Sequence, residues 1–244
     1  MAIKEIRYKD QTFALSYELL HPENQPTVLF LHGWGSHKNL MKQAFGKVLS
    51  EYKHIYLDLP GFGQSPNDHT VLTTHDYAAI ARLFLEALGI APEIIVGHSF
   101  GGKVATLLQP LCLVLVASAG VQVPKPLSVR AKIALTKLLK PVGGAWLRRL
   151  FASKDAAGMN EAMYATFKNV VNEDFEAHFD DVDGKALLFW GTNDTATPLW
   201  TAKRIQEHIG DAELFTFEGD HYFFLHHANA IATTIETHCK DQTA

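Results

Sequence analysis

The chain has 244 residues, of which 47% are hydrophobic and 20% charged, and its formal net charge is −4. These proportions are those of an ordinary globular protein and exclude collagen-like, coiled-coil and disordered classes, and the length suits one core, with or without an insertion. The slight acidic excess argues against a protein that binds nucleic acid through its overall charge, so no nucleic-acid partner is expected.

Short β-rich runs alternate with helical patterns along most of the chain, which is typical of a mostly parallel sheet with helices on both faces. The sequence predicts eight strands, the first two antiparallel, at residues 3–8, 13–19, 27–31, 54–57, 94–96, 112–117, 186–190 and 213–217. Helices are predicted near residues 40–51, 75–88, 100–109, 199–209 and 223–238. The predicted fold class is therefore α/β.

Residues 121–181 break this alternation because they contain no strand pattern. Apolar residues recur there at helical spacing in two stretches, 131–139 and 159–170, and prolines and a Gly143-Gly144 pair interrupt the helices. We therefore expect a small helical cap at 121–181, inserted after the sixth strand. Residues 1–120 and 182–244 would form the core.

Cys112 lies in an apolar run and Cys239 in the final helical stretch, so we expect buried free thiols rather than a disulfide scaffold. The N-terminal residues alternate like a strand and show no secretory signal, so we expect a cytoplasmic protein. The longest apolar run, 111–117, is much shorter than the about 20 residues of a membrane-spanning helix, and no membrane span is predicted.

A reactive serine follows the fifth predicted strand, in Gly97-His98-Ser99-Phe100-Gly101-Gly102. This run matches the G-x-S-x-G pattern, which places a nucleophilic serine on a tight turn between a strand and a helix. The turn needs glycine near the serine, because other side chains would collide with neighbouring backbone. We predict that Ser99 is the nucleophile and interpret His98 as a packed or hydrogen-bonded loop residue.

A serine nucleophile needs a base, and the base needs an orienting acid. Asp194 follows the seventh predicted strand and His221 the eighth, which gives the chain order serine, acid, histidine. Asp220 is an alternative acid, but it adjoins His221 and would have difficulty reaching that ring, so we favour Asp194. His226 and His227 lie five and six residues after His221 and so miss the i, i+4 spacing of helical metal ligands. No metal is therefore expected.

Two further turns follow predicted strands. His32-Gly33-Trp34-Gly35 can aim a backbone N–H at the substrate, so the amides of Trp34 and Phe100 are the predicted oxyanion hole. Asp58-Leu59-Pro60-Gly61-Phe62-Gly63 is typical of a rigid turn, in which we expect Asp58 to hold backbone amides.

With these motifs the chain resembles the α/β-hydrolase superfamily, in its capped esterase and C–C hydrolase branch, over nearly its whole length. The resemblance implies a nucleophilic Ser99, a general base His221, an orienting Asp194 and no cofactor. Dehalogenases and epoxide hydrolases of the superfamily carry aspartate in place of Ser99, which disfavours those activities. His98 and Tyr222 stand where C–C hydrolases often carry asparagine and tryptophan, which favours an ester or thioester substrate.

The sequence therefore predicts a carboxylesterase-like serine hydrolase that cleaves carboxylic esters or thioesters of small or acyl substrates through an acyl-enzyme. One alternative is hydrolysis of a C–C bond in vinylogous diketone ring-cleavage products, with Arg148 or Arg149 binding the substrate carboxylate. The alternative of another class is a non-catalytic ligand receptor or scaffold with the same fold.

Charge is unevenly distributed over the predicted cap. Residues 121–154 carry basic and no acidic side chains, whereas acidic side chains dominate residues 155–184. The two halves can neutralise each other as solvated faces. Alternatively, the basic half can form a docking surface for an anionic substrate or an acidic carrier protein.

Overall fold

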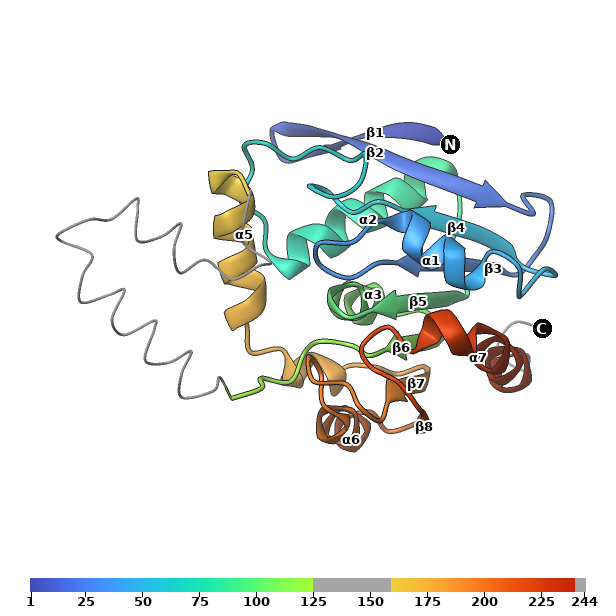
Figure 1. The fold of residues 1–244 in the computed structure, drawn as a ribbon. Helices are drawn as coiled ribbons and strands as arrows, with labels where there is room; N and C mark the ends of the chain where they lie inside the picture. Colours follow the sequence, from blue (N-terminus) through green and yellow to red (C-terminus); the bar gives the residue numbers. More distant parts are fainter. Residues whose placement is uncertain (125–158, 240–244) are drawn as a thin grey trace, which may run out of the picture.

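The computed structural model describes residues 1–124 and 159–239. It contains one eight-stranded sheet in the order β1-β2-β4-β3-β5-β6-β7-β8, in which β1, β2 and β4 pair antiparallel and all later pairs are parallel (Figure 1). The strands are β1 (Ala2–Tyr8), β2 (Gln11–Leu20), β3 (Thr27–Leu31), β4 (Lys53–Leu57), β5 (Ile94–His98), β6 (Cys112–Val116), β7 (Lys185–Gly191) and β8 (Ala212–Phe217). The predicted α/β class with a mostly parallel eight-stranded sheet is confirmed.

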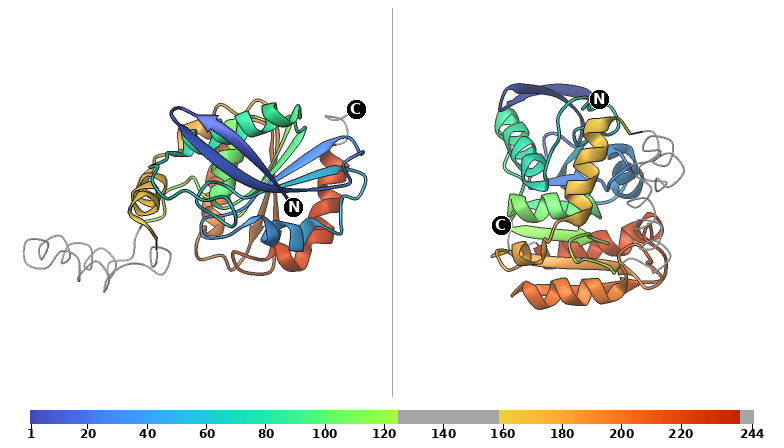
Figure 2. Two further views of the ribbon diagram at one scale, coloured as in Figure 1. Left: turned by 90° about the horizontal axis from the view of Figure 1, so that it is seen from above. Right: turned by 90° about the vertical axis from the view of Figure 1, so that its left-hand side faces the viewer.

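Helices cover both faces of the sheet, as predicted. They are α1 (Lys38–Phe45), α2 (Thr74–Leu88), α3 (Phe100–Leu108), α6 (Leu199–His208) and α7 (Phe224–Cys239). In Figure 2, α1 in blue and α7 in red lie on one side, and α2 and α3 in green lie on the other. Strand β3 is fully buried, with Leu29 in the core under α2, α3 and α6 and Val28 in the core under α1 and α7.

One predicted helix boundary is wrong. The pattern at 40–51 predicts a longer helix, but α1 ends at Phe45. Gly46 is its C-cap, and Leu49 then takes a left-handed conformation, with a φ of 55°. The chain turns here to enter β4, so the apolar spacing continues while the helix does not.

Two elements lie in the described part of the predicted cap: α5 (Glu161–Asn172) and the short 3₁₀ helix η2 (Glu176–Phe179). Asn160 caps α5, because its side chain accepts a hydrogen bond of 2.8 Å from the Met163 N–H. Met163 and Val170 belong to the same apolar core as the sheet residues under α2 and α3. The first helical stretch, 131–139, lies outside the described residues, and the division into core and cap stays a prediction.

The expectation of free thiols is wrong: a disulfide joins Cys112 on β6 to Cys239 at the end of α7. Both residues are fully buried, as expected. The partners are 127 positions apart in sequence, and they meet because α7 packs over the sheet face to which Cys112 points. Only this packing brings the two cysteines together. Over the described ranges, no helix is long and apolar enough to cross a membrane.

Asp58, at the end of β4, holds its turn through several hydrogen bonds. Its carboxylate accepts the N–H groups of Lys38 at 2.7 Å and Gln64 at 3.0 Å, which confirms the predicted role. The Lys38 ammonium lies 2.5 Å from the same carboxylate, and both side chains are almost completely buried. The sequence motif did not reveal this cation.

Replacing Lys38 should be strongly destabilising. Lys38→Met leaves the Asp58 charge buried without its counter-charge, so we expect a loss of about 3–5 kcal/mol in the free energy of unfolding. The control is Lys42→Met, whose Glu18 ion pair is partly exposed and worth about 0–1 kcal/mol. Urea unfolding monitored by circular dichroism measures both, and equal losses would contradict the expectation.

Candidate active site

Ser99 lies on a sharp turn between β5 and α3 and has a φ of 52° and a ψ of −115°. Residues other than glycine rarely adopt this conformation, and such strain is typical of functional sites. Two hydrogen bonds hold the turn: the Ser99 N–H donates to Val116 O at 3.1 Å, and the Ala119 N–H donates to Ser99 O at 3.0 Å. The end of β6 and the loop that follows it therefore fix the backbone on both sides of the serine.

The glycines of the motif allow this turn to pack against the sheet. A Cβ atom at Gly97 would lie 2.5 Å from Gly101 O, and one at Gly101 would lie 2.5 Å from Leu31 O. Both contacts are with backbone atoms and are too close for any side chain. The structure thus gives a steric reason for the predicted G-x-S-x-G pattern.

Asp194 and His221 meet at the carboxyl ends of β7 and β8. His221 Nδ1 lies 2.8 Å from Asp194 Oδ2, and the Asp194 side chain is fully buried. The carboxylate also accepts hydrogen bonds from the N–H groups of Ala196 and Thr197 and from the Thr197 hydroxyl. Burial alone would raise the pKa of Asp194, but the bonds from His221 and Thr197 outweigh it and lower the pKa. The group that orients His221 is therefore an ionised carboxylate.

The alternative acid, Asp220, has another partner. Its carboxylate accepts a hydrogen bond of 2.8 Å from the Tyr222 N–H and so stabilises the turn that carries His221. The His221 ring bonds to Asp194 instead. The choice of Asp194 as the orienting acid stays a prediction.

His98 is buried directly behind His221. Its Nε2 lies 3.2 Å from the His221 carbonyl oxygen, so this nitrogen is the donor and the imidazole holds the backbone of the histidine loop. Burial, and then the nearby His221, lower the pKa of His98 to about 3. His98 is therefore a neutral, hydrogen-bonded loop residue, as interpreted from the sequence.

The residues that carry the two predicted amide donors lie near Ser99. Phe100 is the first residue of α3, where a backbone N–H has no carbonyl partner within the helix. A Cβ atom at Gly33 would lie 3.1 Å from Ser99 Cβ, so the turn that carries Trp34 passes directly against the serine. The Trp34 and Phe100 rings also pack edge-to-face, with centroids 5.5 Å apart.

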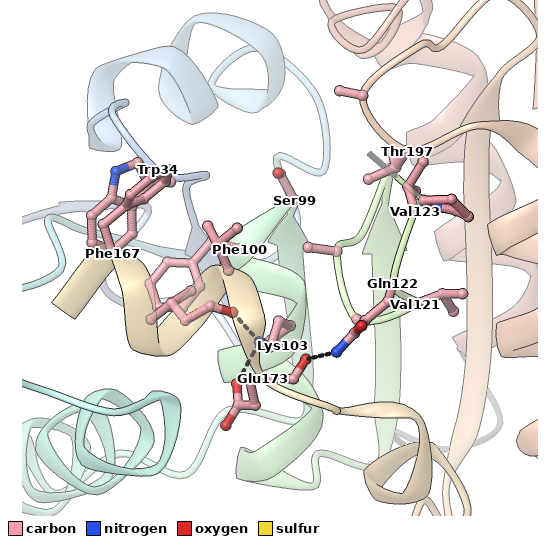
Figure 3. A pocket seen from close by; sticks show the side chains of 16 residues that line it. Trp34, Ser99, Phe100, Lys103, Val121, Gln122, Val123, Phe167, Glu173 and Thr197 are labelled. Carbon is pink, nitrogen blue, oxygen red and sulfur yellow. Dashed lines mark hydrogen bonds and ion pairs between the residues drawn. The ribbon is translucent and has the colours of Figure 1, made fainter. Parts of the chain in front are cut away.

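A cavity of about 740 Å³ opens beside Ser99. Its walls are mainly apolar, and its lining includes Trp34, Phe100, Phe167, Val170, Val121 and Val123. Figure 3 shows the Ser99 side chain between α5 and the loop at residues 119–124. Lys103 and Glu173 also line the cavity and lie together, below Ser99 in this view. Sequence reasoning did not identify Lys103 or Glu173, because neither belongs to a recognisable motif.

The two histidines that the sequence analysis rejected as metal ligands lie on another element. His226 and His227 are on α7, and His227 Nε2 contacts Glu218 O at 2.9 Å. Within residues 1–124 and 159–239, no group of three His, Cys, Asp or Glu side chains could hold a metal ion. Arg148, Arg149 and the other basic residues at 125–154 lie outside the described residues.

A model of the alpha/beta hydrolase family matches residues 28–234. The chain belongs to this family. This hydrolase is 24% identical to the pimeloyl-[acyl-carrier protein] methyl ester esterase of Chromobacterium violaceum, over 89% of this chain and 95% of that protein. It is 23% identical to the uncharacterized hydrolase YugF of Bacillus subtilis, over 82% and 84% of the two chains.

Solved esterases share the fold of this hydrolase. The esterase EaEST of Exiguobacterium antarcticum superposes with a TM-score of 0.76 at 20% identity, over 97% of this chain and 98% of that one. The thermophilic esterase of Thermogutta terrifontis also gives 0.76, at 14% identity and full coverage of both chains. At these identities the likeness concerns the fold alone.

A methyl group at Gly101 should destabilise the hydrolase. Gly101→Ala forces a Cβ atom against the carbonyl oxygens of Leu31 and His32, so we expect a loss of about 1–3 kcal/mol or more. Gly210→Ala is the matched control, because no atom lies within 4 Å of its new Cβ. Urea unfolding compares the two, and a Gly101→Ala variant as stable as the control would refute the steric argument.

Proposed function

We propose that this chain is a serine hydrolase that cleaves carboxylic esters or thioesters of small or acyl substrates through an acyl-enzyme. The main support is the hydrogen bond of 2.8 Å between His221 and the buried, ionised Asp194, close to a serine on a strained turn that faces a cavity. A nucleophile, a base and an orienting acid are the parts that acyl transfer requires.

In the proposed reaction, His221 Nε2 accepts the Ser99 hydroxyl proton while Oγ attacks the acyl carbon. The N–H groups of Trp34 and Phe100 donate hydrogen bonds to the resulting oxyanion. The tetrahedral intermediate then collapses, and the His221 imidazolium gives its proton to the departing alcohol or thiol. Water, activated by the same histidine, releases the acid and restores Ser99.

The surroundings of His221 suit its change of charge in this cycle. Asp194 is ionised and bonds to Nδ1, so it stabilises the imidazolium and leaves Nε2 to face the serine. His98 stays neutral and adds no second positive charge. No hydrogen bond joins the described side chains of Ser99 and His221, and such contacts are often long before a substrate binds.

Two observations bear on the alternatives. C–C hydrolysis of a ring-cleavage product needs a cation for the substrate carboxylate. Lys103 lies in the described part of the cavity, but its charge is already paired with Glu173, which disfavours this alternative. Carrier-bound acyl esters deserve testing, because the Chromobacterium violaceum relative is named for such a substrate. A non-catalytic receptor or scaffold would cleave none of these substrates.

Replacing the serine should abolish turnover. Ser99→Ala removes only the hydroxyl, so we expect a folded protein that neither cleaves p-nitrophenyl esters nor reacts with a fluorophosphonate probe. Probe labelling and ester assays on the wild type and the variant measure this. Continued labelling of Ser99→Ala would show that another residue is the nucleophile, and an inactive, unlabelled wild type would favour the receptor or scaffold.

The two aspartates should differ sharply. Asp194→Asn removes the charge that holds His221 in the required tautomer, so we expect kcat to fall by about 10³ to 10⁴-fold. Asp220→Asn keeps an oxygen that can accept the Tyr222 N–H, so its kcat should change little. Steady-state kinetics on one ester compare them, and a larger loss in Asp220→Asn would reverse the assignment of the acid.

A further inference from the structure

Lys103 is a buried cation that lines the cavity beside Glu173, below Ser99 in Figure 3. It follows Ser99 by four residues on α3, which places it about 6 Å farther along the helix axis. Its side chain is only 3% exposed, and its ammonium forms an ion pair with Glu173. A charge buried this deeply needs a partner, so the pair is a fixed feature of the cavity.

The same lysine fastens α5 to α3. Its Nζ donates a hydrogen bond of 3.0 Å to Val170 O, in the last turn of α5, where backbone carbonyls lack partners within the helix. Glu173 is the C-cap residue of α5 and accepts a hydrogen bond of 2.5 Å from the Thr74 hydroxyl. The ammonium also lies 4.8 Å from the Phe175 ring centroid. Lys103 therefore fixes the end of α5 from the helix that begins beside the nucleophile.

Helix α5 forms one wall of the cavity and is fastened at two further points. Thr166 Oγ1 accepts the Leu72 N–H at 2.9 Å, and the Asn160 side chain donates to Asn67 O at 3.1 Å. These contacts hold Phe167 in the cavity wall, where it packs on Trp34 with ring centroids 5.3 Å apart. The wall is therefore rigidly joined to the rest of the fold.

The opposite wall is the loop at 119–124, which contributes Val121 and Val123. Gln122, between them, donates a hydrogen bond of 3.4 Å to Glu173 O and so links this loop to the end of α5. The cavity thus has an apolar wall on either side of Ser99, and the polar contacts of Lys103, Glu173 and Gln122 lie together away from the serine (Figure 3).

We propose that this channel is the acyl subsite and that the Lys103–Glu173 ion pair is its end wall, which limits the length of an unbranched apolar acyl chain. The inference rests on the proposed ester hydrolysis. An acyl chain that ends before the ion pair gains binding free energy from each methylene that it buries. A longer chain must displace the pair or bend away, and separating buried charges opposes this.

The test is an acyl-length series with one leaving group. p-Nitrophenyl esters from acetate to dodecanoate are compared on the wild type and on Lys103→Ala/Glu173→Ala, which removes both charges and the end wall. We expect the optimum of kcat/KM to move to longer chains. The long-to-short ratio should rise about tenfold, the gain for burying two further methylenes. Lys185→Ala/Glu213→Ala, an ion pair between β7 and β8, is the control and should leave the ratio unchanged.

A second variant covers the case in which the double variant fails to fold. Val123 lies on the opposite wall and is 37% exposed, so Val123→Trp should fold and narrow the channel. We expect it to lower kcat/KM for long chains relative to acetate. An unchanged length profile in Val123→Trp, or in a folded double variant, overturns the subsite.

A second ester series tests whether the channel binds the alcohol part of the substrate instead of the acyl part. In a second series the acyl group is acetate and the alcohol chain varies. If the variants shift this series and not the acyl series, the channel binds the alcohol and the inference is wrong. If the wild type cleaves no ester, the proposed function fails and the inference fails with it, whereas an active enzyme with an unshifted acyl profile refutes the inference alone.

Discussion

Close backbone packing around Ser99 is the constraint on which the site depends. The serine has a positive φ, which is held because β6 and the loop that follows it bond to the two sides of the turn. Gly97 and Gly101 let α3 approach the strand ends to distances that no side chain allows. The same approach directs the start of α3 toward the cavity. The position of the serine and that of the Phe100 amide therefore have one steric origin.

Charge is organised around this rigid turn. Buried carboxylates are stable here only because each has several donors: Asp58 has Lys38 and two backbone amides, and Asp194 has Thr197, Ala196 and His221. Asp58 supports the turn after β4, whereas Asp194 orients the histidine. One residue type thus stabilises a turn at one strand end and, in the proposed function, prepares chemistry at another.

The sequence predicted the strands and the motif turns well, because both depend on local patterns. Strands such as β3 are continuous apolar runs, and the turn at Ser99 requires glycines at fixed offsets. Contacts between distant segments left no such signal. The Cys112–Cys239 bond and the Lys103–Glu173 ion pair depend on how α7 and α5 pack on the rest of the fold. The end of α1 was missed because its apolar spacing continues past Gly46.

The attachment of α5 by Lys103 also bears on how this cavity can diverge during evolution. A substitution at Lys103 removes the bond to Val170 O that holds the end of α5, and so disturbs the helical wall of the cavity. Val121 and Val123 lie on a loop, so substituting them does not release a helix in this way. The two walls therefore differ in evolvability: variation that survives selection should accumulate on the loop, while the helical wall is inherited together with α3.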